Sequence, residues 1–159
     1  MIRKAKLQNK SAYIYRMKKL LLFVCLLSVA GVTGKTTHRN DNIPEFMQGK
    51  FKDDYGIKYE INDTLWFQLP KSKFRIIKWN LKEQYLVARN GDGNPGDGGL
   101  YTRIDFMEFK NMSPWKWGYC LTAYDAPTDI AAEAMAKADR KHPKTGCNGF
   151  PFSRMKINE

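Results

Sequence analysis

Residues 85–107 read YLVARNGDGNPGDGGLYTRIDFM, and this stretch decides the fold. Two runs rich in aromatic and β-branched residues, 84–90 and 100–107, flank a glycine-rich segment at 91–99. Such runs on either side of a turn-forming segment predict an antiparallel β-hairpin. Because successive side chains of a strand point to opposite sides, the pairing register also decides which side chains share a face.

A hairpin paired symmetrically about this loop places Arg89 opposite Tyr101 and Tyr85 opposite Asp105. One face is then polar and carries Tyr85, Arg89, Tyr101, Arg103 and Asp105. The other face is largely apolar and is expected to face the core; it carries Leu86, Ala88, Thr102, Ile104 and Phe106. Guanidinium, carboxylate and phenol groups on one face can line a pocket for an anionic or hydroxylated ligand. The alternative is a solvated surface on which Arg103 pairs with Asp105.

Similar short runs between turn signals occur on both sides of the hairpin. The strands they predict span 49–61, with a bend at Gly56, and 65–69, 73–79, 115–124 and 150–157. An alanine-rich stretch at 130–140, opened by a Pro and an Asp, predicts one late α-helix. About seven strands with local connections, and no βαβ alternation, favour a mainly β fold. We predict an antiparallel meander barrel with one helix before the last strand, and a β-sandwich is the alternative.

The N-terminal 34 residues are typical of a cleavable signal peptide. Seven basic residues and no acidic one accompany an apolar run at 20–30, which is shorter than the roughly 20 residues that a membrane span needs. We expect cleavage after Ala30 or Gly34, no stable membrane span afterwards, and Met17 as an alternative translation start. A polar linker at 35–45 and a single barrel domain at 46–159 follow. The protein is therefore expected to be secreted or periplasmic.

The charge balance is less basic than it first looks. The chain has 27 Lys and Arg against 16 Asp and Glu, a net charge of +11, and the leader supplies most of this excess. After the leader, basic and acidic residues are interspersed along the sequence, whereas nucleic-acid-binding proteins cluster basic residues on one surface. We therefore expect no nucleic-acid partner.

Two cysteines remain once the leader is removed, Cys120 and Cys147. An even pair in a chain destined for an oxidising compartment predicts a disulfide, and two separate buried thiols are the alternative.

The loop at 90–97 is rich in oxygen ligands, but Pro95 and Tyr101 stand where an EF-hand loop requires Gly and Glu. We expect no metal site and no cofactor.

Trp115, Trp117 and Tyr119 alternate in sequence and are expected to share one face of a strand. Aromatic rings arranged in this way can hold an apolar or aromatic ligand, and they can also simply form the core. Gly118, between them, allows a neighbouring backbone or ligand to approach closely.

Three short segments resemble motifs of the calycin barrels, the group that includes lipocalins. Gly49-Lys50-Phe51 is similar to the Gly-x-Trp of the first strand, Thr122-Ala123-Tyr124 to the Thr-Asp-Tyr turn, and Arg154 to the late arginine that packs over the first motif. Phe and Ala replace the usual Trp and Asp. The resemblance implies a barrel whose lumen holds a small, mostly apolar ligand.

The expected function is binding of a small apolar or aromatic ligand by an exported barrel. The candidate contact residues are Tyr85, Arg89, Tyr101, Arg103, Asp105, Trp115 and Trp117. A protein-interaction module or inhibitor with an envelope protein partner and no ligand cavity is the alternative. The predicted domain contains one histidine, His142, and no nucleophile–base signature, so catalysis is not favoured. An enzyme would have to use the polar face of the hairpin.

Overall fold

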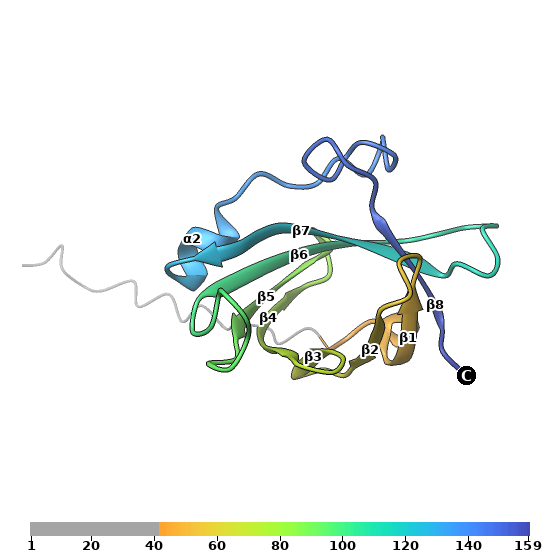
Figure 1. The fold of residues 1–159 in the computed structure, drawn as a ribbon. Helices are drawn as coiled ribbons and strands as arrows, with labels where there is room; N and C mark the ends of the chain where they lie inside the picture. Colours follow the sequence, from red (N-terminus) through yellow and green to blue (C-terminus); the bar gives the residue numbers. More distant parts are fainter. Residues whose placement is uncertain (1–41) are drawn as a thin grey trace, which may run out of the picture. The chain divides into compact units, whose positions relative to one another are not determined.

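Residues 42–159 are described by the structure, a computed structural model, and their strands close into an antiparallel barrel (Figure 1). The expected signal peptide at 1–34 and the first part of the expected linker lie outside the described residues. In chain order the elements are η1 (Glu45–Met47), β1 (Gly49–Asp53), β2 (Lys58–Ile61), β3 (Leu65–Gln68), β4 (Ser72–Asn80), β5 (Tyr85–Asn90), β6 (Tyr101–Glu108), β7 (Trp117–Ala126), α2 (Asp129–Glu133) and β8 (Ser153–Ile157).

The predicted meander barrel is confirmed, with eight strands instead of about seven. The difference comes from 49–61, which forms the hairpin β1–β2 and not one bent strand. Asp53 ends β1 because its carboxylate accepts hydrogen bonds from the backbone N–H groups of Tyr55 and Ile57. Gly56 in the same turn has a φ of +90°, which favours glycine. β1 then pairs with β8 and closes the barrel.

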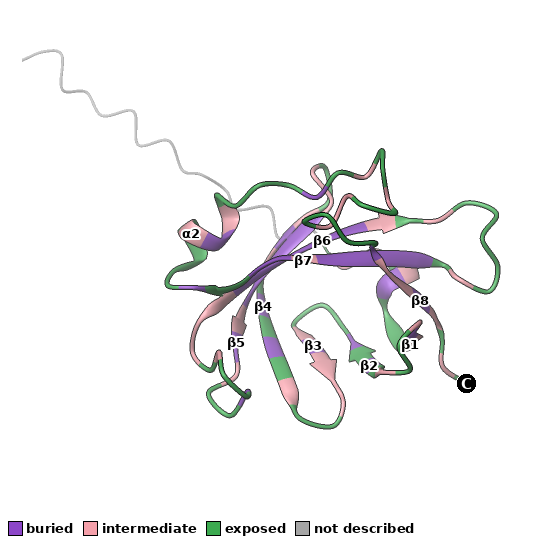
Figure 2. Cartoon of the chain, turned by 45° about the horizontal axis from the view of Figure 1, so that its top comes forward, coloured by how far each residue is buried: buried purple, intermediate pink, exposed green. Residues whose placement is uncertain are grey.

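The decisive hairpin forms in the predicted register. Arg89 lies opposite Tyr101 and Tyr85 lies opposite Asp105. Its apolar face points inward, where Leu86, Ala88, Ile104 and Phe106 belong to the main core and Thr102 is also buried. Burial is heaviest in β5, β6 and β7, and Figure 2 shows the long buried stretch of β7.

Aromatic side chains dominate the interior of the barrel. Trp66 lies at the centre and contacts Tyr59, Trp117 and Tyr119 edge-on, with ring centroids 5.1–5.9 Å apart. Phe51 meets Trp117 in the same geometry at 5.3 Å. Such edge-to-face pairs each add roughly 0.5–1.5 kcal/mol to the stabilisation from burial. The inward side chains form one continuous hydrophobic core.

The late helix is much shorter than predicted, and the expected span of 130–140 is wrong. α2 ends at Glu133 after an N-cap in which Thr128 Oγ1 accepts from the N–H of Ala131. The carbonyls of Glu133 and Met135 accept hydrogen bonds from Arg103, so they are engaged with the barrel instead of a next helical turn. Helices this short depend on such tertiary contacts. None of the helices within residues 42–159 has the length and apolar character needed to cross a membrane.

A disulfide joins Cys120 in β7 to Cys147, as predicted. The bond fastens the segment between α2 and β8 to the outside of the barrel. Next to it, Ala138 and Phe152 pack against Cys120 in a small hydrophobic cluster of their own.

We predict that replacing both cysteines by serine lowers the free energy of unfolding by about 3 kcal/mol, because the unfolded chain then gains the entropy of an open loop. The two cysteines are 27 residues apart. Urea unfolding measured with and without a reducing agent checks this. The reductant should destabilise the wild type by a similar amount and leave the double variant unchanged; equal effects on both would contradict the prediction.

Candidate functional site

The predicted polar face of the hairpin is divided between two environments. Tyr85, Arg103 and Asp105 are buried, whereas Arg89 and Tyr101 are only partly covered. The cause is α2, which packs on β5, β6 and β7, and the chain that follows it. The alternative of a solvated surface is therefore wrong for the buried three, because the protein's own segment occupies the space above them, although Arg103 does pair with Asp105 as that alternative stated.

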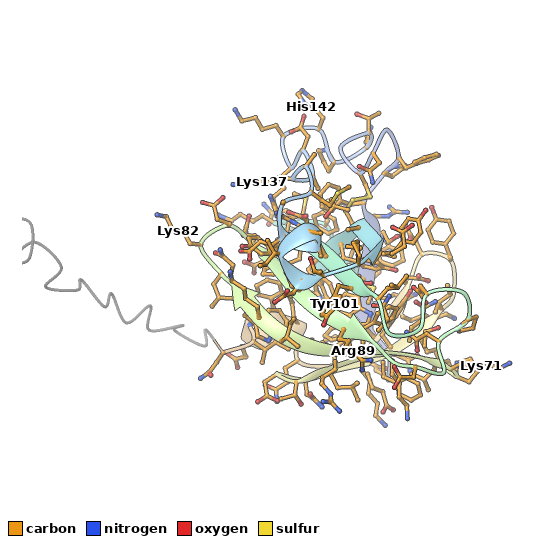
Figure 3. The ribbon with its side chains drawn as sticks, turned by 90° about the vertical axis from the view of Figure 1, so that its left-hand side faces the viewer. Lys71, Lys82, Arg89, Tyr101, Lys137 and His142 are labelled. Carbon is orange, nitrogen blue, oxygen red and sulfur yellow. A yellow bond between two sulfur atoms is a disulfide. The ribbon has the colours of Figure 1, made fainter. Side chains whose placement is uncertain are left out.

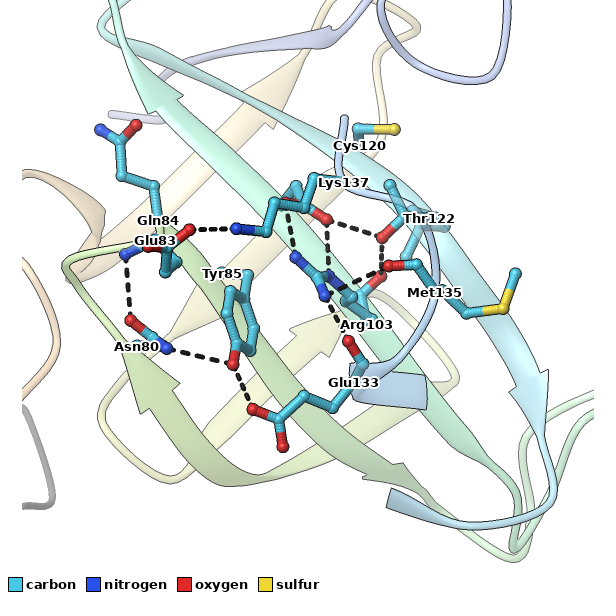
Figure 4. Close-up of polar contacts among 12 residues, drawn as sticks. Asn80, Glu83, Gln84, Tyr85, Arg103, Cys120, Thr122, Glu133, Met135 and Lys137 are labelled. Carbon is cyan, nitrogen blue, oxygen red and sulfur yellow. Dashed lines mark hydrogen bonds and ion pairs between the residues drawn. The ribbon is translucent and has the colours of Figure 1, made fainter. Parts of the chain in front are cut away.

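Asp105 is the acceptor that this buried cluster shares, and Figure 4 shows two of its donors, Arg103 and Thr122, side by side. Arg103 donates to both carboxylate oxygens, at 2.9 Å from Nε and 3.1 Å from Nη2, and its guanidinium lies 4.0 Å from the ring centroid of Tyr85. Thr122 Oγ1 donates to the same carboxylate at 2.7 Å, and Arg140 Nη2 donates at 2.8 Å. Asp105 is 0% exposed and Arg103 is 2% exposed. One carboxylate thus pairs with two guanidinium groups.

Glu133 makes the second polar contact between α2 and the barrel. Its carboxylate accepts hydrogen bonds from Lys78 Nζ and from the Tyr85 hydroxyl. The Lys78 bond is the main reason why the pKa of Glu133 lies below its ordinary value. Burial, followed by the bond to Glu133, raises the pKa of Tyr85. Every nitrogen of Arg103 also donates within the protein. The cluster therefore fastens the α2 segment to the barrel.

Arg89 and Tyr101 lie at the outer surface, close to each other in the side view of Figure 3. Arg89 pairs with Asp92 of the glycine-rich loop at 2.8 Å. Two asparagines hold this loop in place. Buried Asn90 donates to the carbonyls of Asp97 and Tyr124. Asn94 accepts from the backbone N–H of Lys73 and donates to the carbonyl of the same residue. Among residues 42–159, His, Cys, Asp and Glu side chains form no group of three that could hold a metal ion.

The expected aromatic face is also divided. Trp117 and Tyr119 belong to the core, as the core alternative predicted. Trp115 precedes β7 and lies outside the barrel, with Arg154 at 4.8 Å and Lys156 at 5.4 Å from its ring centroid. The expectation that all three share one face is wrong, because strand geometry begins only at Trp117.

A short hydrogen-bonded chain connects polar groups inside the core. The Tyr59 hydroxyl donates to Asp53 at 2.9 Å and lies 2.8 Å from the Tyr119 hydroxyl. Burial is the main reason why the pKa of Tyr59 is strongly raised, and it raises the pKa of Tyr119 to about 12. Both phenols therefore stay protonated at neutral pH and serve the packing.

A hollow with a mainly apolar lining lies on the outside of the barrel, and we call it the outer cleft. Its volume is about 830 Å³. Three segments form its walls: the β1–β2 turn, the β6–β7 connection and the loop before β8. Its apolar lining consists of Tyr55, Met107, Phe109, Met112, Pro143, Pro151 and Phe152. Charged groups also line it, namely Asp54, Glu108, Lys110, Lys144 and Arg154.

Gly118 explains how one wall of the outer cleft is built. A Cβ atom at this position would lie 2.7 Å from Cζ of Phe109, so only glycine allows the Phe109 ring to lie on β7. The close approach expected at Gly118 is thus made by a side chain of the protein. On another wall, Arg154 pairs with Asp54 at 2.9 Å and joins β8 to the β1–β2 turn.

Comparison of the chain with protein-family models, curated proteins and solved structures gives no match. The sequence did not indicate the outer cleft, since its walls come from three distant segments without a shared motif. The one local signal was Gly118, which marked a close approach without saying what approaches.

We predict that Asp105→Asn destabilises the fold by about 3 kcal/mol or more, because it leaves two largely buried guanidinium groups without their counter-charge. Asp92→Asn is the matched control, since the Arg89–Asp92 pair is exposed and its loss should cost less than about 1 kcal/mol. Urea unfolding of both variants measures the difference. Equal losses would show that Asp105 does not have this role.

We also predict that part of the attachment of α2 is lost in acid. The pKa of Glu133 is lowered from its ordinary value of 4.5, so its contribution is fully present above pH 4.5 and disappears as the pH falls through the lowered value. The stability difference between wild type and Glu133→Gln should therefore shrink from about pH 7 to about pH 3. Unfolding titrations at several pH values measure this difference, and a constant one would contradict the prediction.

Proposed function

We propose that this protein is an exported binding protein that holds a small apolar or aromatic ligand in the outer cleft. The observation that carries the proposal is the cleft itself. Its volume of about 830 Å³ falls within the roughly 300–1,000 Å³ typical of small-molecule sites. Apolar and aromatic side chains predominate in its lining, and a few charged groups at its sides can orient a polar end of the ligand.

The proposal keeps the binding role implied by the calycin resemblance and moves the site from the lumen to the outside. The reason is the packing of the interior. Large side chains such as Trp66, Trp117 and Phe106 are fully buried and belong to one core cluster inside the barrel. A ligand in the lumen would have to displace them, whereas the outer cleft is hollow already.

Export to an oxidising compartment is part of the same proposal. The Cys120–Cys147 disulfide supports it, because such bonds persist mainly outside the reducing cytosol. The loop that this disulfide anchors contributes Pro143, Pro151 and Phe152 to the cleft, so oxidation and an intact binding wall are linked.

A protein-interaction module is the second candidate, and one residue favours it. Phe150 is 71% exposed at the end of a tight turn that two backbone hydrogen bonds close between Cys147 and Phe150. A rigid, exposed aromatic side chain is a typical anchor at protein interfaces. Pull-down from envelope extract with wild type and Phe150→Ala tests this candidate; a stoichiometric partner lost only with the variant would favour it over a ligand carrier.

We predict that a hydrophobic fluorescent probe, N-phenyl-1-naphthylamine, binds the wild-type protein. Met107→Glu and Met112→Glu should each weaken binding by about tenfold or more, because a carboxylate within an apolar lining must lose hydration. Ile130→Glu introduces the same charge at an apolar side chain that is 76% exposed on α2, away from the cleft lining. This control should bind the probe as the wild type does.

Native mass spectrometry after gentle extraction supplies a second measurement. A co-purifying small molecule that is present with wild type and Ile130→Glu, and absent from the two cleft variants, supports the proposal. Probe binding that all three variants weaken equally, or that none weakens, overturns the assignment to the outer cleft.

A further inference from the structure

A second candidate surface, separate from the outer cleft, is formed by cations at outward strand positions of the barrel. Taken together, the outward positions of β8, β1, β2, β4 and β5 carry mainly cations, those of β3 carry Leu65 and Phe67, and Glu60 is the one outward carboxylate on these strands. Lys50 pairs with Glu60, Arg154 with Asp54, and Lys78 with Glu133 of α2. The other six cations of these strands define what we call the basic face: Lys52, Lys58, Lys73, Arg75, Arg89 and Lys156. Arg89 among them pairs with Asp92 of the glycine-rich loop.

Like charges stand directly opposite each other on this basic face. Lys52 is the cross-strand partner of Lys58 on one side and of Lys156 on the other, so three lysines form a row across β2, β1 and β8. At about 4.8 Å between neighbouring strands, the row is about 10 Å long. Arg75 and Arg89 form a second like-charged pair across β4 and β5. Such pairs destabilise a sheet by themselves, and a bound anion removes the repulsion.

The basic face also has few carboxylates to neutralise it. Within residues 42–159, Arg89 alone among its six cations has a carboxylate within salt-bridge distance, that of Asp92. Lys73 and Lys156 instead lie over the rings of Phe67 and Trp115. The surface therefore presents positive potential to the solvent and complements a polyanion.

We infer that the basic face binds a linear anionic polysaccharide, a chain of sugars carrying carboxylate or sulfate groups, laid across the strands. The curvature of the barrel favours a chain over a membrane surface. The six cations lie on β8, β1, β2, β4 and β5 of a closed barrel, so no flat surface can contact all of them. A flexible chain can follow this convex path and neutralise the cations in turn.

The aromatic side chains on this face favour a polysaccharide over a nucleic acid. Proteins that bind single-stranded nucleic acid without sequence preference combine cations with aromatic rings on which the bases stack. Here the ring of Phe67 is covered by Lys73 at 5.2 Å, and the ring of Trp115 is approached by two cations. These rings hold cations in place and are not free to stack on bases.

Binding of heparin, a sulfated polysaccharide, tests the inference. We expect the wild type to bind heparin with an affinity that falls as salt rises, because bound counterions are released. The double variant Lys52→Gln/Lys58→Gln should bind about tenfold more weakly and with a shallower dependence on salt. The matched control Lys82→Gln/Lys141→Gln removes the same charge from exposed positions outside the basic face and should bind as the wild type does.

Thermal unfolding accompanies the titration, and the Lys52/Lys58 variant should be at least as stable as the wild type because its like-charge contacts are relieved. Equal losses in both double variants would overturn the inference, since binding would then follow net charge alone. Preferential binding of a dT oligonucleotide, or of phosphatidylglycerol vesicles over heparin, would also overturn it. Met107→Glu should leave heparin binding unchanged, which separates this surface from the outer cleft.

Discussion

The buried carboxylate of Asp105 is the contact on which the outside of this barrel depends. It accepts hydrogen bonds from Arg103 of its own strand and from Arg140 of the segment after α2. Two guanidinium groups can be buried here only because this carboxylate and nearby backbone carbonyls satisfy them. The segment is held at Glu133 and Arg140, reaches the disulfide at Cys147, and then forms a wall of the outer cleft. A single ion cluster thus links the hairpin to the candidate site.

The size of the barrel explains why its interior is a packed core and why both candidate sites lie on its outside. A closed sheet of eight strands has an interior that side chains can fill, and here aromatic rings fill it edge to edge. With its interior filled, this barrel has room for a binding site only at its connections and outer surfaces. The outer cleft is formed by three connections, and the basic face is formed by strand positions that point away from the core.

Charge shows most clearly why a linear sequence can mislead. In the sequence the cations alternate with other residues and are interspersed with acids, and this was the reason for expecting no nucleic-acid partner. Strand alternation places Lys52 outward and Asp53 inward, so two neighbours in sequence end in opposite environments. Strand pairing then sets Lys52 beside Lys58 and Lys156. The resulting cationic row exists only in the paired sheet.

The sequence by itself determined the features that depend on local periodicity and on short connections. These are the antiparallel meander, the register of Tyr85 opposite Asp105, the inward face of the hairpin, and the pairing of Cys120 with Cys147. The tertiary structure alone decided the early end of α2, the burial of Arg103, the outer position of Trp115 and the existence of the outer cleft. Each of these depends on contacts between segments distant in the chain. The alternation of side chains along a strand shows which residues share a face. It does not show which distant segment of the chain covers that face.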